Sequence, residues 1–330
     1  MRSIGQALVC TTVLLSGPAW AQGGGVAAAV EGLPVEGIDH VAITVSDIDS
    51  TVAFYSKALP FKVAKRFRVK GSAFPKELLS KRYPSVEIAL VKMPTGTIQL
   101  MDFEPGKAVT PNPRPVNAPG YSHICFQSAS KDPAIKRFMS AGLQIISRFQ
   151  RDDGVDIGGY GVRYAYGRDP DGIMIENESL DAPKRDEAAW ITHIANVVHD
   201  PEAMLAFYSR LLGKPPHRTI AQENRPRLDD VVAIDNISIK GGWFNLGAME
   251  IEVWHYARPL TPRPTNKRKL DEIGYNSFAL RVADLKAEKA RLKALAVEQS
   301  AKAVNLGGHR QIYAYDPEGN LFAVVEKARD

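Results

Sequence analysis

Residues 37–45 read Gly-Ile-Asp-His-Val-Ala-Ile-Thr-Val, an alternation of apolar and polar side chains that is typical of a half-buried β-strand. Asp47 follows as a candidate helix N-cap, and residues 50–59 have a helical pattern. This pattern contains the sequence Ala53-Phe-Tyr-Ser. The stretch therefore predicts a strand followed directly by a helix.

The same strand and helix return later in the chain. Residues 190–198 read Trp-Ile-Thr-His-Ile-Ala-Asn-Val-Val, and Ala206-Phe-Tyr-Ser follows. His40 precedes Ala53 by 13 residues (53 − 40), and His193 precedes Ala206 by the same 13 residues (206 − 193). An equal interval between matching elements indicates an internal duplication.

Two weaker copies complete the pattern. One begins with Gly120-Tyr-Ser-His123 and the other with Gly274-Tyr-Asn-Ser277. Strand-like runs follow each predicted helix, and the tight-turn sequences Asp169-Pro-Asp-Gly and Asp316-Pro-Glu-Gly join the last two strands of the weaker copies. We therefore expect four units, each with the order β-α-β-β-β.

The composition limits the class of protein. Apolar residues make up 45% and charged residues 24% of 330 residues, which excludes a disordered chain and a polytopic membrane protein. The net charge of +5 is small and spread along the chain, so nucleic acid is not an expected partner. Only Cys10 and Cys125 are present, which excludes a disulfide framework and a cysteine-based zinc site.

The first 21 residues have the features of a secretory signal peptide. Arg2 precedes an apolar stretch, and Ala19-Trp20-Ala21 forms an A-x-A cleavage site. We expect a periplasmic or secreted protein that has no membrane attachment after cleavage. Residues 22–35 are rich in glycine and alanine and are expected to form a flexible lead-in.

This organisation resembles the vicinal-oxygen-chelate superfamily, which includes glyoxalase I, methylmalonyl-CoA epimerase, extradiol dioxygenases and fosfomycin-resistance proteins. The G-x-x-H strand starts, the A-F-Y-S helix and the D-P-D-G turn carry the resemblance, over residues 36–328. It implies an α+β fold in which paired βαβββ units form cup-shaped mixed sheets. We expect two such domains, at residues 36–180 and 190–328, joined by a linker at 181–189.

The resemblance also implies one divalent metal ion, held by ligands from the first and last strands of two paired units. Carried over residue by residue, the ligands in the first domain are His40, Gln99, His123 and Glu176. Two imidazoles, a carboxylate and an amide oxygen suit Fe, Mn, Co, Ni or Zn.

The second domain lacks part of this set. His193 and Glu250 match one ligand pair, but Ser277 and Ala323 stand where the second histidine and glutamate are expected. We therefore expect a degenerate second site, with His193 retained as a core residue.

Two carboxylates are candidates for catalysis, Glu176 and Glu87. Glu87 interrupts an apolar strand, in a V-E-I context similar to that of a proton-transfer glutamate in methylmalonyl-CoA epimerase. A solvent-facing Glu87, or one paired with a nearby arginine or lysine, is the alternative.

The expected function is metal-assisted proton transfer, of isomerase, epimerase or lyase type, on a small substrate with adjacent oxygen atoms. An Fe(II) dioxygenase with a two-histidine, one-carboxylate triad is one alternative, and a protein that sequesters a ligand without turnover is another. The residues leave open whether the protein is a monomer or a homodimer.

Overall fold

The computed structural model describes residues 35–105, 113–149 and 152–326. The predicted signal peptide at 1–21 and nearly all of the predicted lead-in therefore lie outside the described residues, as does the very end of the chain. None of the helices in the described part has the length and apolar character needed to span a membrane.

The four predicted βαβββ units are confirmed. The first unit contains β1 (Gly37–Thr44), α1 (Ile48–Tyr55), β2 (Lys62–Lys70), the 3₁₀ turns η2 (Gly71–Ala73) and η3 (Lys76–Leu78), β3 (Ser85–Lys92) and β4 (Thr97–Asp102). The second contains β5 (Gly120–Ala129), α2 (Ala134–Ala141), β6 (Gln144–Ile145), β7 (Val155–Asp156), β8 (Val162–Arg168) and β9 (Met174–Leu180). The third contains β10 (Trp190–Val197), α3 (Pro201–Leu212), β11 (Arg218–Glu223), α4 (Pro226–Val232), β12 (Ser238–Leu246) and β13 (Met249–Arg258). The fourth contains β14 (Gly274–Val282), α5 (Leu285–Ala294), β15 (Val304–Leu306), β16 (His309–Tyr315) and β17 (Leu321–Glu326).

Aspartates begin three of the helices that follow a first strand. The Asp47 carboxylate accepts a hydrogen bond from the backbone N–H of Ser50 at 2.7 Å, as expected for an N-cap. Asp200 accepts one from Ala203, and Asp284 caps α5 in the same way. These caps fix the point at which each strand turns into its helix.

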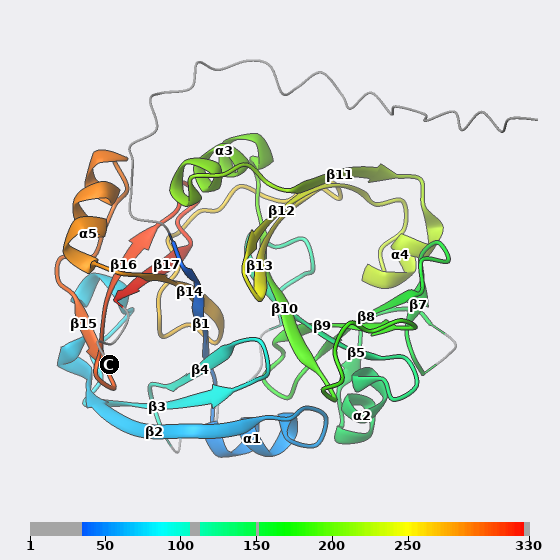
Figure 1. The fold of residues 1–330 in the computed structure, drawn as a ribbon, viewed down its shortest axis with the longest axis horizontal. Coiled ribbons are helices and arrows are strands. Elements are labelled where there is room, and N and C mark those ends of the chain that lie inside the picture. The colour runs from blue at the N-terminus through cyan, green and yellow to red at the C-terminus, as the bar shows by residue number, and fades with distance from the viewer. Residues whose placement is uncertain (1–34, 106–112, 150–151, 327–330) are drawn as a thin grey trace, which may run out of the picture. The chain divides into compact units, whose positions relative to one another are not determined.

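The pairing of the units differs from the expected order. The first unit joins the fourth through antiparallel β1 and β14, and the second joins the third through antiparallel β5 and β10 (Figure 1). We call these the first sheet (β15-β16-β17-β14-β1-β4-β3-β2) and the second sheet (β11-β12-β13-β10-β5-β9-β8-β6). The expected pairing of units within 36–180 and within 190–328 is therefore corrected, because each stretch contributes one half of both sheets.

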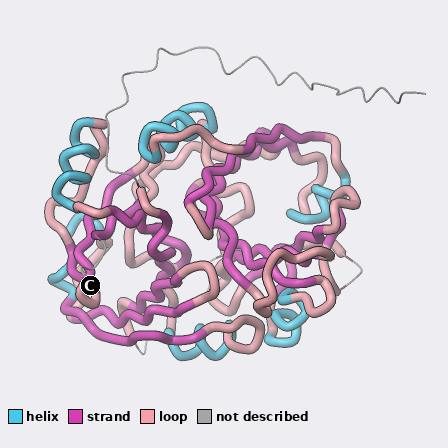
Figure 2. Tube along the Cα trace, viewed as in Figure 1, coloured by secondary structure: helices cyan, strands magenta, loops and turns pink. Residues whose placement is uncertain are grey.

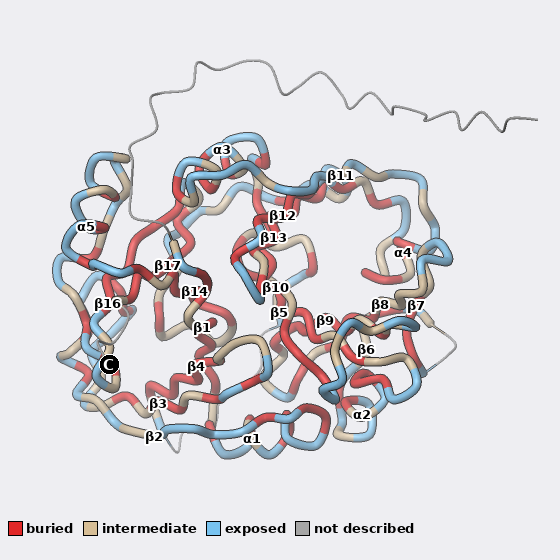
Figure 3. The backbone as a smooth tube through the Cα atoms, in the orientation of Figure 1, coloured by how far each residue is buried: buried red, intermediate tan, exposed pale blue. Residues whose placement is uncertain are grey.

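Both sheets are curved, and the strands run around each curve in Figure 2. The central strands β1, β5, β10 and β14 are mostly buried, whereas the edge strands β2 and β11 are exposed (Figure 3). β2 carries five Lys and Arg side chains, which discourage pairing with another chain.

The inner face of the first sheet is filled with apolar side chains. Phe74, Leu78 and Leu79 come from the segment between β2 and β3 and pack against sheet residues such as Met101 and Ala323. Gln99 shares a face with Met101 because the two residues are two positions apart in β4. This cup is therefore occupied by the chain's own core.

Two buried aspartates tie the helices to the tight turns of the next unit. The Tyr55 hydroxyl of α1 donates to Asp169 Oδ2 at 2.9 Å, and the Tyr208 hydroxyl of α3 donates to Asp316 at 3.2 Å. Burial, the main cause, raises the pKa of Asp169 to about 7 and that of Asp316 to about 6. Consecutive units thus stay in contact although they belong to different sheets.

Candidate metal centre

Four buried side chains meet on the inner face of the second sheet. They are His123 of β5, Glu176 of β9, His193 of β10 and Glu252 of β13. These four strands are neighbours in the order β13-β10-β5-β9. Each glutamate pairs across the ladder with the residue two positions after a histidine, Ala195 with Glu252 and Cys125 with Glu176. The period of two along a strand places each glutamate on the same face as its histidine.

The spacing of the four ligand atoms suits one metal ion. His193 Nε2 lies 3.0 Å from Glu176 Oε2 and 3.2 Å from Glu252 Oε2. His123 Nε2 lies 3.3 and 3.5 Å from the same two oxygens. Bonds of about 2.0–2.2 Å place neighbouring ligands of one ion about 2.9–3.5 Å apart. The set therefore fits a divalent ion without rearrangement.

The hydrogen bonds of the two imidazoles favour the same conclusion. His123 Nδ1 is 3.0 Å from Ser122 Oγ, and His193 Nδ1 is 3.3 Å from Thr192 Oγ1. Both Nε2 atoms are buried without a hydrogen-bond partner among the described residues. With the proton on Nδ1, each Nε2 presents a lone pair to the centre, as a metal ligand requires.

Without a metal, protons take its place. Burial opposes protonation, but the Glu252 and Glu176 carboxylates outweigh it and raise the pKa of His193 well above its usual value. The pKa of His123 is raised by the same balance, with Glu176 as the stronger partner. Burial alone would raise the pKa of Glu176, but the two histidines lower it. A cation entering the cluster must therefore displace protons.

A cavity of about 490 Å³ reaches the cluster, and Glu176, His193 and Glu252 all line it. Its apolar walls include Tyr166, Trp243 and Trp254, together with the aliphatic side chains of Leu228, Val231 and Val232 from α4. Arg218, whose guanidinium lies 3.9 Å from the centre of the Trp243 ring, also lines the cavity. The second sheet thus has an open cup where the first sheet has a filled one.

Cys125 is fully buried beside this cluster. Its sulfur groups with carboxylate oxygens of Glu176 and Glu178, all within 4.8 Å of one another. Burial, followed by the charge of Glu178, raises the pKa of the Cys125 thiol well above its usual value. A thiol in this state is a poor nucleophile and a poor ligand.

The structure brings together only two of the four sequence-predicted ligands. His123 and Glu176 are in the cluster, whereas His40 and Gln99 lie on the first sheet. His40 Nδ1 contacts Asp39 Oδ1 at 2.9 Å, and the Gln99 amide lies 3.5 Å from Met101 Sδ. The correction follows from the unit pairing, which joins the second unit to the third rather than to the first.

Glu87 is also placed outside the cluster. It lies on β3 of the first sheet, where Arg66 and Arg68 both bind its carboxylate, Arg68 at 2.7 Å. The hydrogen bond from Arg68 leads the interactions that lower the pKa of Glu87. The structure thus replaces the catalytic hypothesis for Glu87 with the ion-paired alternative.

His193 and Glu252 are the candidate metal ligands that sequence reasoning missed. His193 was expected to be a core residue, and Glu250 was matched to the last-strand ligand. Glu250 instead lies 3.1 Å from His217 Nε2. An available signal was the interval: Gln99 follows His40 by 59 residues (99 − 40), and Glu252 follows His193 by 59 (252 − 193).

Comparison with known proteins agrees with this architecture. The family described as the Glyoxalase/Bleomycin resistance protein/Dioxygenase superfamily matches residues 37–177 and, through a second model, residues 192–315. A virulence protein of Salmonella typhimurium is 28% identical over 143 residues, which are 43% of this chain and 83% of that protein.

Two solved structures share the fold along most of the chain. Glyoxalase I from Zea mays is 17% identical with a TM-score of 0.59, covering 88% of this chain and 92% of its own. A putative dioxygenase from Bacillus subtilis is 12% identical with a TM-score of 0.56, covering 90% and 87%. With its four βαβββ units, its two curved sheets and both family matches, the chain belongs to the Glyoxalase/Bleomycin resistance protein/Dioxygenase superfamily, also called the vicinal-oxygen-chelate superfamily.

Proposed function

We propose that the protein is a metal-dependent enzyme that transfers a proton on a small substrate with two adjacent oxygen atoms, as an isomerase or a lyase. The observation that carries the proposal is the cluster of His123, Glu176, His193 and Glu252 at the wall of an open cavity. A divalent ion held by these four side chains supplies Lewis-acid polarisation of the substrate oxygens.

The protein's own carboxylates are placed to move the proton. Glu176 and Glu252 both face the cavity, and either can accept a proton from a carbon next to a carbonyl. The same carboxylic acid then returns the proton to a neighbouring carbon or to a leaving group. Tyr166, Trp243 and Trp254 restrict water around the reacting carbon.

Export remains part of the proposal, on the strength of the N-terminal sequence. A coenzyme A thioester is not expected outside the cytoplasm, so we propose a free, small carbon acid as substrate. Because the second and third units complete the cup within one chain, no second copy is needed to assemble the cluster.

Metal analysis of matched variants tests the location of the site. We expect purified protein to hold about one equivalent of divalent metal, and His193→Ala and Glu252→Gln to lose it. His40→Ala removes the corresponding histidine of the filled cup and is expected to keep the metal. Loss of metal in His40→Ala with retention in His193→Ala would overturn the assignment.

A second experiment tests the reaction. Hydroxyacetone, a carbon acid with adjacent oxygens, is incubated with the metal-loaded protein in D₂O and followed by proton NMR. We expect enzyme-dependent exchange of carbon-bound hydrogen that Glu252→Gln abolishes. Oxygen uptake with catechol would instead favour dioxygenase chemistry, and its occurrence without exchange would refute the proton-transfer proposal.

A further inference from the structure

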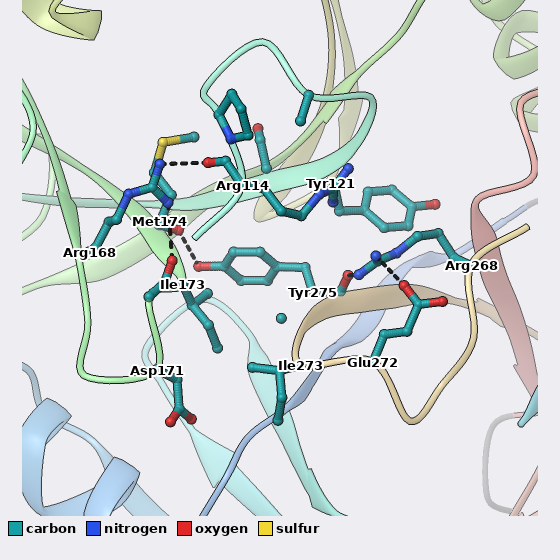
Figure 4. Close-up of a pocket in the computed structure, with 15 residues that line it drawn as sticks. Arg114, Tyr121, Arg168, Asp171, Ile173, Met174, Arg268, Glu272, Ile273 and Tyr275 are labelled. Carbon is teal, nitrogen blue, oxygen red and sulfur yellow. Dashed lines mark hydrogen bonds and ion pairs between the residues drawn. The ribbon is translucent and has the colours of Figure 1, made fainter. Parts of the chain in front are cut away.

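A second cavity, of about 350 Å³, is lined by none of the four residues of the metal cluster (Figure 4 shows this cavity). Residues of β5, β8 and β9 line it on the second sheet, and the start of β14 with the segment before it lines it on the side of the first sheet. Ser122 also borders it, so the cavity reaches the hydroxyl that contacts His123. Its lining is distinct from that of the 490 Å³ cavity.

Three arginines from separate segments line this second cavity. They are Arg114 before β5, Arg168 at the end of β8, and Arg268 before β14. Figure 4 shows their side chains around the ring of Tyr275. Because the three arginines come from distant parts of the sequence, it is the fold that brings their positive charges together.

Two of these arginines have no carboxylate partner among the residues that the structure describes. Arg168 donates to the carbonyls of Gly172 at 3.1 Å and Arg114 at 2.6 Å, and Arg114 donates to the carbonyl of Pro119. Neither forms an ion pair within the described ranges. Burial, followed by repulsion from Arg268, lowers the pKa of Arg114 to about 10, and burial lowers that of Arg168.

The acidic residues of the lining do not balance this charge. Glu272 is already paired with Arg268, whose Nε is nevertheless a buried donor without an acceptor in the described structure. Asp171 accepts hydrogen bonds from the backbone and hydroxyl of Ser46, and Figure 4 shows its carboxylate pointing away from the arginines. Hydrogen-bond donors and positive charge of the arginines therefore remain available to a bound ligand.

We propose that this cavity binds a small oxyanion, the phosphate or carboxylate group of a compact metabolite. Planar guanidinium groups bind two oxygens at once, which suits both anions. The rest of the lining, including Pro115, Ile173 and Ile273, suits a short carbon chain attached to that group. A bound oxyanion would lie against both sheets and bridge them.

Calorimetric titration of the full chain with inorganic phosphate and, separately, with succinate tests the site, at constant ionic strength set with chloride. We expect saturable binding of at least one of them, and the better ligand identifies the anion. Arg114→Gln is expected to weaken binding at least tenfold. Arg168→Lys, which keeps the charge but loses the planar fork, should weaken binding less than Arg114→Gln does.

Arg148→Gln is the matched control, because Arg148 pairs with exposed Asp235 and does not line the cavity. We expect its affinity to equal that of the original chain. Absence of saturable binding by both anions, or equal binding by Arg114→Gln and the original chain, would overturn the proposal. Metal content is independent of this outcome, so the proposed enzymatic function is tested separately.

Discussion

Asp169→Asn should stabilise the protein, and more so as the pH rises. The carboxyl group is buried and accepts hydrogen bonds from the Tyr55 hydroxyl and from the backbone N–H groups of Asp171 and Ile173, each at 2.9 Å. Asparagine keeps the oxygen that serves the two N–H groups, and the tyrosine hydroxyl can turn to accept from the new amide. The substitution therefore removes a buried charge while preserving the turn.

The magnitude follows from the pKa in the folded protein. Burial raises the pKa of Asp169 to about 7 from its ordinary value of 3.8, so the folded state holds the proton more tightly than the unfolded chain does. Stability from this group is complete below pH 3.8 and is lost as the pH rises to about 7. Between pH 5 and pH 8 the free energy of unfolding falls by about 2.5 kcal/mol because of this group. The full loss, reached well above the folded-state pKa, is about 4 kcal/mol.

Urea unfolding at pH 5 and pH 8 measures this difference. At each pH we compare the free energy of unfolding of Asp169→Asn with that of the original chain. We expect the gain in stability from the substitution to be about 2.5 kcal/mol larger at pH 8 than at pH 5. Asp186→Asn, which makes the same substitution at an exposed aspartate, is the matched control. Equal differences at the two pH values would refute the idea that Asp169 carries a buried charge at pH 8.

Three further outcomes are expected. Zinc binding should release protons, so the heat measured by calorimetry should vary with the ionisation enthalpy of the buffer. The affinity for zinc should rise with pH because protons compete for His193 and His123. Heats of binding that do not depend on the buffer would contradict this prediction. Glu87→Gln should leave metal content unchanged and cost at most about 1 kcal/mol in urea unfolding, since Arg66 and Arg68 are largely exposed; loss of metal would return Glu87 to the site. Leu78→Ala should cost about 2–5 kcal/mol, because this fully buried side chain fills the first cup, and metal content should stay the same; an unfolding free energy unchanged by the substitution would show that the cup is not packed.

Local features of the fold could be predicted from the sequence. Alternation marked the first strands, and Asp47 began its helix as expected, because such signals depend on neighbouring residues only. The pairing of the units could not be predicted in this way. First strands β1, β5, β10 and β14 are all apolar and alternating, so any two offer similar edges to each other.

Because the pairing of the units could not be predicted, the ligand set of the candidate site could be predicted only in part. His123 and Glu176 were identified correctly as neighbours because β5 and β9 belong to one unit. The other two ligands depend on which unit completes the sheet. His40 and His193 lie in similar first strands, so the sequence did not show which of these histidines joins His123. Glu250 and Glu252 both lie on β13, two positions apart, and the 59-residue interval together with the ladder pairing of Ala195 with Glu252 distinguishes them.

The nested order of the sheets has a consequence for how the chain reaches its native state. β5 and β10 can meet once the second and third units exist, because only the segment between Leu180 and Trp190 separates those units. The second and third units lie between β1 and β14 in the sequence. The contact between β1 and β14 therefore closes a much longer loop than the contact between β5 and β10. We therefore expect the second sheet to form early and the first sheet to form after the metal cup is complete. A chain cut between residues 180 and 190 would divide both sheets at once, so its halves should become protease-resistant only when they are refolded together.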